Sequence, residues 1–64
     1  MKTWKVREMI SHIEQDGWFI VTQKGSHRQF KHPTKPGRVT VPGALGKDLP
    51  TGTAKSILKQ AELE

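Results

Sequence analysis

Two helical stripes of hydrophobic residues frame the chain. The first stripe is Val6, Met9, Ile10 and Ile13. The second stripe is Ala54, Ile57, Leu58 and Ala61. Both have the i, i+3, i+4, i+7 spacing of an amphipathic helix. We therefore predict helices over about residues 3–15 and 51–62.

The residues at the ends of these stripes suit helix termini. Thr3 can cap the first helix, and Gly17 suits the left-handed position just past its end. Thr51 or Thr53 can cap the second helix. Trp4 lies off the first stripe, so we expect it to pack against the last helix.

Three short segments between the helices favour strands because they are rich in β-branched and aromatic residues or alternate in polarity. The predicted strands are 18–23, 26–32 and about 38–41. Lys24-Gly25 favours a turn, since glycine adopts positive φ at no steric cost. Residues 33–37 form a basic hairpin loop whose prolines exclude a strand interior. Residues 42–50 form a loop rich in glycine and proline.

The first strand has apolar residues on both predicted faces. Regular alternation places Trp18, Ile20 and Thr22 on one face and Phe19, Val21 and Gln23 on the other. This pattern indicates a strand covered at least partly on both sides. If the helices cover only one side, Phe19 and Val21 are left for a partner protein.

The element order predicts an α+β fold, α-β-β-β-α. Two helices with one apolar stripe each must bury those stripes, and a three-stranded antiparallel sheet is the surface available. Both helices are therefore expected on one face of the sheet. The opposite face is left open to water or to a partner.

The composition excludes several classes of function. The 64 residues, 33% of them hydrophobic, predict one small domain (1–64) with no room to enclose a nucleotide cofactor. The absence of cysteine excludes disulfides, a thiolate zinc site and a Cys nucleophile. The apolar run 18–21 is far short of the roughly 20 residues of a membrane span, and no signal core follows Lys2. We expect a cytoplasmic protein with no cofactor, no metal and no membrane contact.

Positive charge is concentrated in the middle of the chain. Residues 25–41 contain four Lys or Arg residues and no acid, which accounts for four of the five net positive charges. Such a patch attracts phosphate backbones by releasing counterions. We therefore expect RNA to contact Lys24, Ser26, Arg28, Gln29, Lys31, Lys35 and Arg38.

The middle strand presents a row of polar groups. Phe30 is its one large apolar residue and should point at the helices, with Arg28 and His32 on the same side. The opposite, open face then carries an imidazole, an amide and an ammonium about 6–7 Å apart. These groups belong to His27, Gln29 and Lys31.

This row suits RNA cleavage without a metal. The 2′-hydroxyl of the RNA is the nucleophile, so the protein needs a proton acceptor and positive charge for the phosphorane-like transition state. An imidazole, with an ordinary pKa of about 6.5, can act as general base or acid. We predict His27 as the catalytic group, with a 2′,3′-cyclic phosphate and a 5′-hydroxyl as products.

The other histidines fit different roles. His32, beside Pro33, is expected mainly to shape the turn, with a second catalytic role as the alternative. His12 lies beside the apolar stripe of the first helix. A zinc site needs three or four convergent ligands, and only His27 and His32 are near each other, on opposite faces of the strand.

Several short motifs occur in a fixed order. They are Gly17-Trp18, Lys24-Gly25-Ser26-His27, Phe30-Lys31-His32-Pro33, Val39-Thr40-Val41-Pro42, Gly46-Lys47-Asp48-Leu49, Gly52-Thr53 and Ile57-Leu58-Lys59-Gln60-Ala61. From about residue 5 to 63 the chain resembles the HicA-type toxins, small mRNA interferases of type II toxin–antitoxin modules. The resemblance implies a fold like the double-stranded-RNA-binding domain.

The resemblance also implies a site and a partner. The catalytic His of the family follows Gly-Ser, and here that residue is His27. A HicB-type antitoxin would cover it and the open sheet face, so the toxin would be a monomer when free and part of a hetero-oligomer when neutralised. Many members carry a further His after the third strand, where this chain has Gly43-Ala44-Leu45. If that His contributes to activity, this chain would be slow, inactive or reliant on another residue.

Two other functions fit the same residues. The first is a non-catalytic RNA-binding module, which reads duplex RNA by shape and 2′-hydroxyl contacts and leaves it intact. The second is an interaction protein whose sheet face binds another protein and has no RNA affinity at about 100 mM salt.

Overall fold

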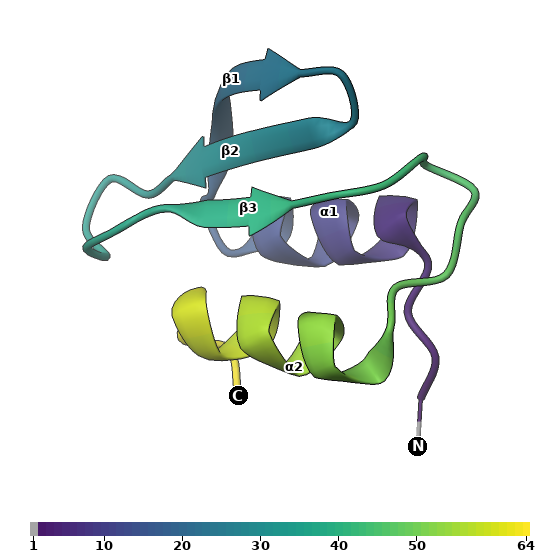
Figure 1. Ribbon diagram of the computed structural model, residues 1–64. Helices are drawn as coiled ribbons and strands as arrows, with labels where there is room; N and C mark the ends of the chain where they lie inside the picture. Colours follow the sequence, from purple (N-terminus) through teal and green to yellow (C-terminus); the bar gives the residue numbers. More distant parts are fainter. Residues whose placement is uncertain (1) are drawn as a thin grey trace.

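The computed structural model describes residues 2–64, in which a three-stranded sheet lies over two helices (Figure 1). The elements are α1 (Val6–Gln15), β1 (Phe19–Lys24), β2 (His27–Lys31), β3 (Val39–Val41) and α2 (Thr51–Gln60). The strands are antiparallel in the order β1-β2-β3. The predicted α-β-β-β-α order is confirmed, and the arrangement is that of the double-stranded-RNA-binding fold.

Both apolar stripes are buried against the same face of the sheet. Val6, Met9 and Ile13 of α1 are buried, as are Ala54 and Ile57 of α2 and its C-cap residue, Ala61. The sheet contributes Phe30, Val39 and Val41 to this core, and Trp18 closes one end of it. Phe30 and Val39 are direct cross-strand partners. The prediction that Phe30 faces the helices is therefore confirmed.

The start of α1 and the caps of both helices differ from those predicted, whereas α2 begins at Thr51 as predicted. Residues before α1 run extended beside the loop that precedes α2, joined by a bridge between Lys5 and Asp48. This pairing delays α1, so that Lys5, not Thr3, is the N-cap, and its backbone N–H donates to Glu8 Oε1 at 2.9 Å. No side chain caps α2, which starts after Pro50. Both threonines predicted as its caps lie inside its first turn, Thr51 and Thr53.

A β-bulge changes the faces of β1. Ile20 pairs with Phe30, but Thr22 pairs with Gln29, so Val21 is the extra residue. Side chains alternate along a strand, and one extra residue reverses that alternation beyond it. Thr22 therefore shares the open face with Gln29, and the predicted grouping of Thr22 with Ile20 is wrong.

Strand β1 is exposed along its whole length. It is an edge strand on the far side of β2 from β3, and in Figure 1 it lies at the side of the sheet away from α2. Phe19, Ile20 and Val21 are 48%, 46% and 42% exposed. The prediction that β1 is covered on both sides is wrong, because the helices pack beneath β3 and a bulged strand twists away from its neighbours.

Neither helix in residues 2–64 has the length and apolar content required to cross a bilayer.

Candidate functional site

A tight hairpin places His27 at the start of β2. Lys24 pairs with His27, leaving Gly25 and Ser26 as a two-residue loop. Gly25 has a φ of +56° and Ser26 does not have positive φ, the pattern of a type II′ turn with glycine at its first central position. Gln23 Nε2 donates to the Gly25 carbonyl oxygen at 2.9 Å. The imidazole is therefore carried on an ordered hairpin, and its residue is exposed.

The open face is hollowed beside His27. A cavity of about 360 Å³ lies on this face and is lined by Thr22, Lys24, His27, Gln29 and Thr40. All three strands contribute to this lining. Because of the bulge, Thr22 lies on this face rather than on the helix face. The sequence pattern predicted His27, Gln29 and Lys24, but it missed Thr22, which the bulge moves to this face, and Thr40, which lies on the neighbouring strand β3.

Positive charge surrounds the hollow without any carboxylate from the sheet. Lys24 lines it, and Lys31 is exposed further along β2. Arg38 Nη1 donates to Gln29 Oε1 at 2.8 Å, which brings a guanidinium onto the same face. The sequence contains no Asp or Glu between Asp16 and Asp48. The face is therefore complementary to a polyanion.

The Arg38 contact also orients the Gln29 amide. Its oxygen accepts from the guanidinium, so its nitrogen is left to donate to a ligand, an assignment made from the hydrogen-bond partners. The hollow thus offers an imidazole, an ammonium, an amide donor and two threonine side chains within one surface.

Two of the residues predicted to contact RNA have polar partners within the protein. Arg28 Nη1 donates to the Gly43 carbonyl at 2.8 Å and to the Ser26 carbonyl at 3.1 Å, and its residue pairs with Val41 on the helix side. Lys35 is half-buried, and its Nζ forms an ion pair with Asp16 Oδ2 at 2.5 Å. Both cations therefore stabilise the fold and lie outside the hollow. Ser26 is exposed at the hairpin tip.

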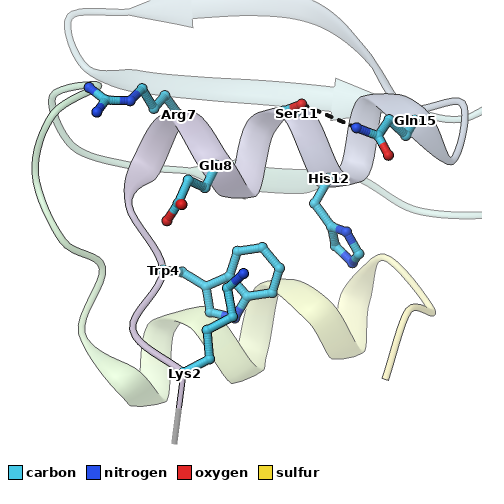
Figure 2. A pocket seen from close by; sticks show the side chains of 7 residues that line it. All are labelled: Lys2, Trp4, Arg7, Glu8, Ser11, His12 and Gln15. Carbon is cyan, nitrogen blue, oxygen red and sulfur yellow. Dashed lines mark hydrogen bonds between the residues drawn. The ribbon is translucent and has the colours of Figure 1, made fainter.

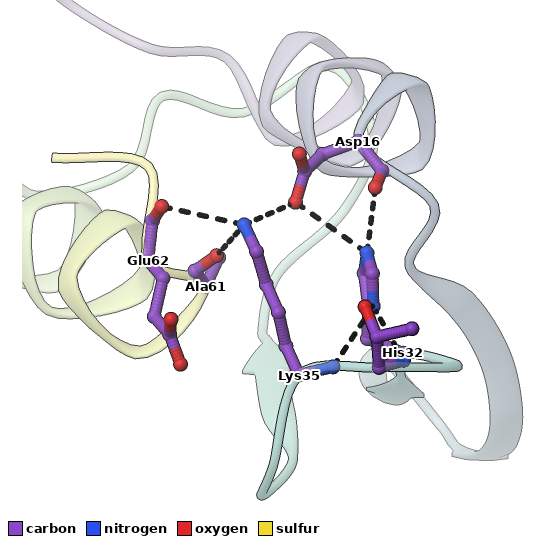
Figure 3. Close-up of polar contacts among 6 residues, drawn as sticks. Asp16, His32, Lys35, Ala61 and Glu62 are labelled. Carbon is purple, nitrogen blue, oxygen red and sulfur yellow. Dashed lines mark hydrogen bonds and ion pairs between the residues drawn. The ribbon is translucent and has the colours of Figure 1, made fainter.

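His32 is part of a network that joins the basic loop to both helices (Figure 3). Its Nε2 lies 2.6 Å from the Asp16 carbonyl oxygen, and its Nδ1 accepts from the backbone N–H groups of Thr34 and Lys35, each at 3.1 Å. These partners assign the proton to Nε2. The prediction that His32 shapes the turn is confirmed, and both of its ring nitrogens are engaged.

Lys35 completes this network. Its Nζ donates to Asp16 Oδ2 and to the carbonyl oxygens of Ala61 at 3.0 Å and Glu62 at 3.3 Å (Figure 3). The hydrogen bond from Lys35 lowers the pKa of the Asp16 carboxyl, supported by the positive charge of Lys35 and opposed by partial desolvation. The loop between β2 and β3 is thereby tied to the C-terminal ends of α1 and α2.

A second hollow lies along α1, away from His27. Its volume is about 430 Å³, and its lining includes Trp4, Arg7 and His12 (Figure 2). The rings of Trp4 and His12 lie 4.9 Å apart, and Lys2 Nζ lies 4.4 Å above the Trp4 ring. Trp4 also lines a cleft with residues of α2, as predicted. His12 thus packs on an aromatic ring on the helix side of the sheet.

The loop after β3 packs against the start of α1. Leu45 and Lys47 accept backbone hydrogen bonds from Arg7 at 3.1 Å and Val6 at 2.9 Å. The loop contains no imidazole. Within residues 2–64, no three His, Cys, Asp or Glu side chains gather as a metal site would require.

Comparison with known proteins identifies the family. No curated protein matches the chain closely enough to count as a relative. The family model for the HicA toxin of bacterial toxin–antitoxin systems, however, matches residues 6–63, which include every helix and strand described above. The chain therefore belongs to the HicA toxin family, whose members act with an antitoxin partner.

Proposed function

We propose that the protein is an endoribonuclease that cleaves mRNA without a metal ion, with His27 as general acid–base. The observation that carries the proposal is the position of His27, at the edge of an open hollow on a sheet that carries cations and no carboxylate. Membership of a toxin family supports the same reading.

The reaction uses the RNA's own 2′-hydroxyl as nucleophile. The His27 imidazole accepts the hydroxyl proton while the 2′-oxygen bonds to phosphorus, and the bond from phosphorus to the 5′-oxygen breaks. The leaving 5′-oxygen takes up a proton from water, which gives a 5′-hydroxyl and a 2′,3′-cyclic phosphate. Lys24 and Gln29 line the hollow and Arg38 contacts Gln29, and we expect these three groups to stabilise the negative charge of the transition state. DNA, which lacks the hydroxyl, is not a substrate.

A HicB-type antitoxin is the proposed inhibitor. An antitoxin that covers the open face would bury His27 and exclude RNA from the hollow. Because the exposed residues Phe19 and Val21 lie on the edge strand β1, they offer the apolar area that a protein partner requires. Inhibition would then be competitive with RNA.

The test compares His27→Ala with His12→Ala. Both variants lose one imidazole, but only His27 lines the hollow on the open face of the sheet, whereas His12 lines the hollow along α1. We expect His27→Ala to lower the rate of RNA cleavage about 10²-fold or more and to abolish growth arrest, while His12→Ala remains active. Analysis of the RNA ends should show the cyclic phosphate and the 5′-hydroxyl. An equally active His27→Ala variant would refute the role of His27.

The alternative is RNA binding without cleavage. The lack of an imidazole in the loop after β3 favours it. It predicts salt-sensitive RNA affinity, no new RNA ends at any incubation time, and an affinity that His27→Ala leaves almost unchanged. The same two proteins therefore separate the candidates.

A further inference from the structure

Phe19 is a half-exposed aromatic ring on the open side of the sheet, opposite the helices. The other Phe and Trp rings in residues 2–64 have contacts elsewhere. Trp18 and Phe30 are buried in the core, and Trp4 packs against His12 on the helix side. Phe19 remains 48% exposed. An exposed ring of this size is costly to leave in water, so a ligand that covers it gains affinity.

Its position is set by the register of the sheet. Phe19 pairs directly with Lys31, before the bulge, so it lies on the same face as Lys31 and Gln29. Directly opposed side chains in antiparallel strands have Cβ atoms about 4.5–5.5 Å apart. An apolar ring and an ammonium thus stand next to each other, a spacing that suits the base and the phosphate of one nucleotide.

This pair lies at a distance from the proposed reaction centre. Lys31 is four residues from His27 along β2, or about 13 Å. That distance exceeds a single nucleotide, so the ring would contact a neighbour of the nucleotide that is cut. The intervening surface carries Gln29 and its Arg38 partner and no acid.

From this geometry we infer that Phe19 is a stacking platform for one unpaired RNA base, with Lys31 beside it for the adjoining phosphate. The inference rests on the proposed function, which it extends to the substrate: RNA must be single-stranded over the face, since a base inside a duplex cannot offer its ring to Phe19. Charge favours RNA over a protein here, because Lys31 adjoins Phe19 and no carboxylate of the sheet offsets it.

The neighbouring residue Ile20 provides a matched control for the loss of apolar area. Ile20 is 46% exposed, close to Phe19, but pairs with Phe30 and so belongs to the helix side of the sheet. Replacing Phe19 by Leu keeps an apolar side chain and removes the aromatic face. Ile20→Ala removes similar apolar area and leaves the ring in place.

The experiment uses a short single-stranded oligoribonucleotide with one mapped cleavage position. It also uses a set of variants of this oligonucleotide, each of which has one abasic position. Base stacking contributes about 1–3 kcal/mol, so Phe19→Leu should weaken RNA binding by roughly 5- to 150-fold. KM should rise while kcat stays nearly constant, and Phe19→Tyr should retain binding. In the parent protein, one base-free position should bind less tightly, and Phe19→Leu should erase that penalty.

Several results would overturn the inference. They are an unchanged KM in Phe19→Leu, an equal loss in Ile20→Ala, or a base-removal penalty that persists without the ring. Weakened antitoxin binding with unaltered RNA binding would assign Phe19 to the protein partner instead. Affinity for an uncleavable oligonucleotide carrying 2′-methoxy groups tests stacking even if the protein cuts nothing, so failure of the proposed function remains distinguishable.

Discussion

Replacing Gly17 by Ala should strongly destabilise the protein. Gly17 has a φ of +108°, and a Cβ atom built there would lie 2.8 Å from His32 Nε2 and 3.4 Å from its Cδ2. The imidazole cannot move away freely. It is held by the Asp16 carbonyl and two backbone N–H groups of the following loop, and it lies edge-on to Trp18 with the ring centroids 5.3 Å apart.

Two effects set the magnitude. A residue with a Cβ in the left-handed region costs roughly 1–2 kcal/mol. Moving His32 removes the donor from the Asp16 carbonyl, which costs about 1–3 kcal/mol. The sum, about 2–5 kcal/mol, is a large part of the roughly 3–10 kcal/mol expected for 64 residues. The melting temperature should fall by roughly 8–40 °C.

Thermal unfolding followed by circular dichroism measures this effect, with Gly25→Ala as control. Gly25 also has positive φ, at +56°, but a Cβ there would meet nothing within 4 Å. It should therefore show the backbone cost alone, about 1–2 kcal/mol. Equal losses in the two variants, or a Gly17→Ala protein within about 0.5 kcal/mol of the parent, would show that the His32 contact does not matter.

Three further predictions concern charged groups. Because Lys35 lowers the pKa of Asp16, the ionised carboxylate stabilises the fold above its ordinary pKa of about 3.9, and this contribution is lost as the pH falls through the lower folded-state value. Stability should thus decline less steeply below about pH 4 in Lys35→Met than in the parent; equal slopes in acid titrations would contradict this. If Lys24 contacts a phosphate, Lys24→Gln should reduce the slope of log K against log salt by about 0.7 for single-stranded RNA, whereas Lys55→Gln, on α2, should not. Glu8→Ala removes the acceptor of the Lys5 backbone N–H at the start of α1, and it should lower the free energy of unfolding, measured in urea, by about 0.5–1 kcal/mol.

The strands show where reasoning from periodicity holds. Phe30 is the one large apolar residue of β2, and burying it sets the direction of every side chain in that strand. His27 and Gln29 therefore had to lie on the open face. In β1 the same reasoning holds only as far as Val21, because a bulge depends on pairing with β2 and leaves no mark on the pattern of β1.

The helix stripes could be predicted for the same reason, and so could the start of α2 at Thr51, whereas the start of α1 and the caps of both helices could not. The 3.6-residue period of each stripe is a local property that persists whatever surrounds it. The start of α1 depends on the Lys5–Asp48 bridge, which joins residues far apart in the sequence. Thr3 therefore does not act as the N-cap, although its side chain is suited to that position, because the helix begins only after the bridged Lys5.

The positive charge of the middle of the chain could be predicted from the sequence, but which of its cations stay available to a ligand could not. The sequence alone shows that the middle of the chain is basic and free of acids, and that an imidazole belongs to the uncovered side of the sheet. Folding then divides the cations: Lys35 and Arg28 turn to internal acceptors, while Lys24 and Arg38 stay by the hollow. Composition and period are properties of the chain as written, whereas the availability of a charged group depends on which atoms the fold brings within reach of it.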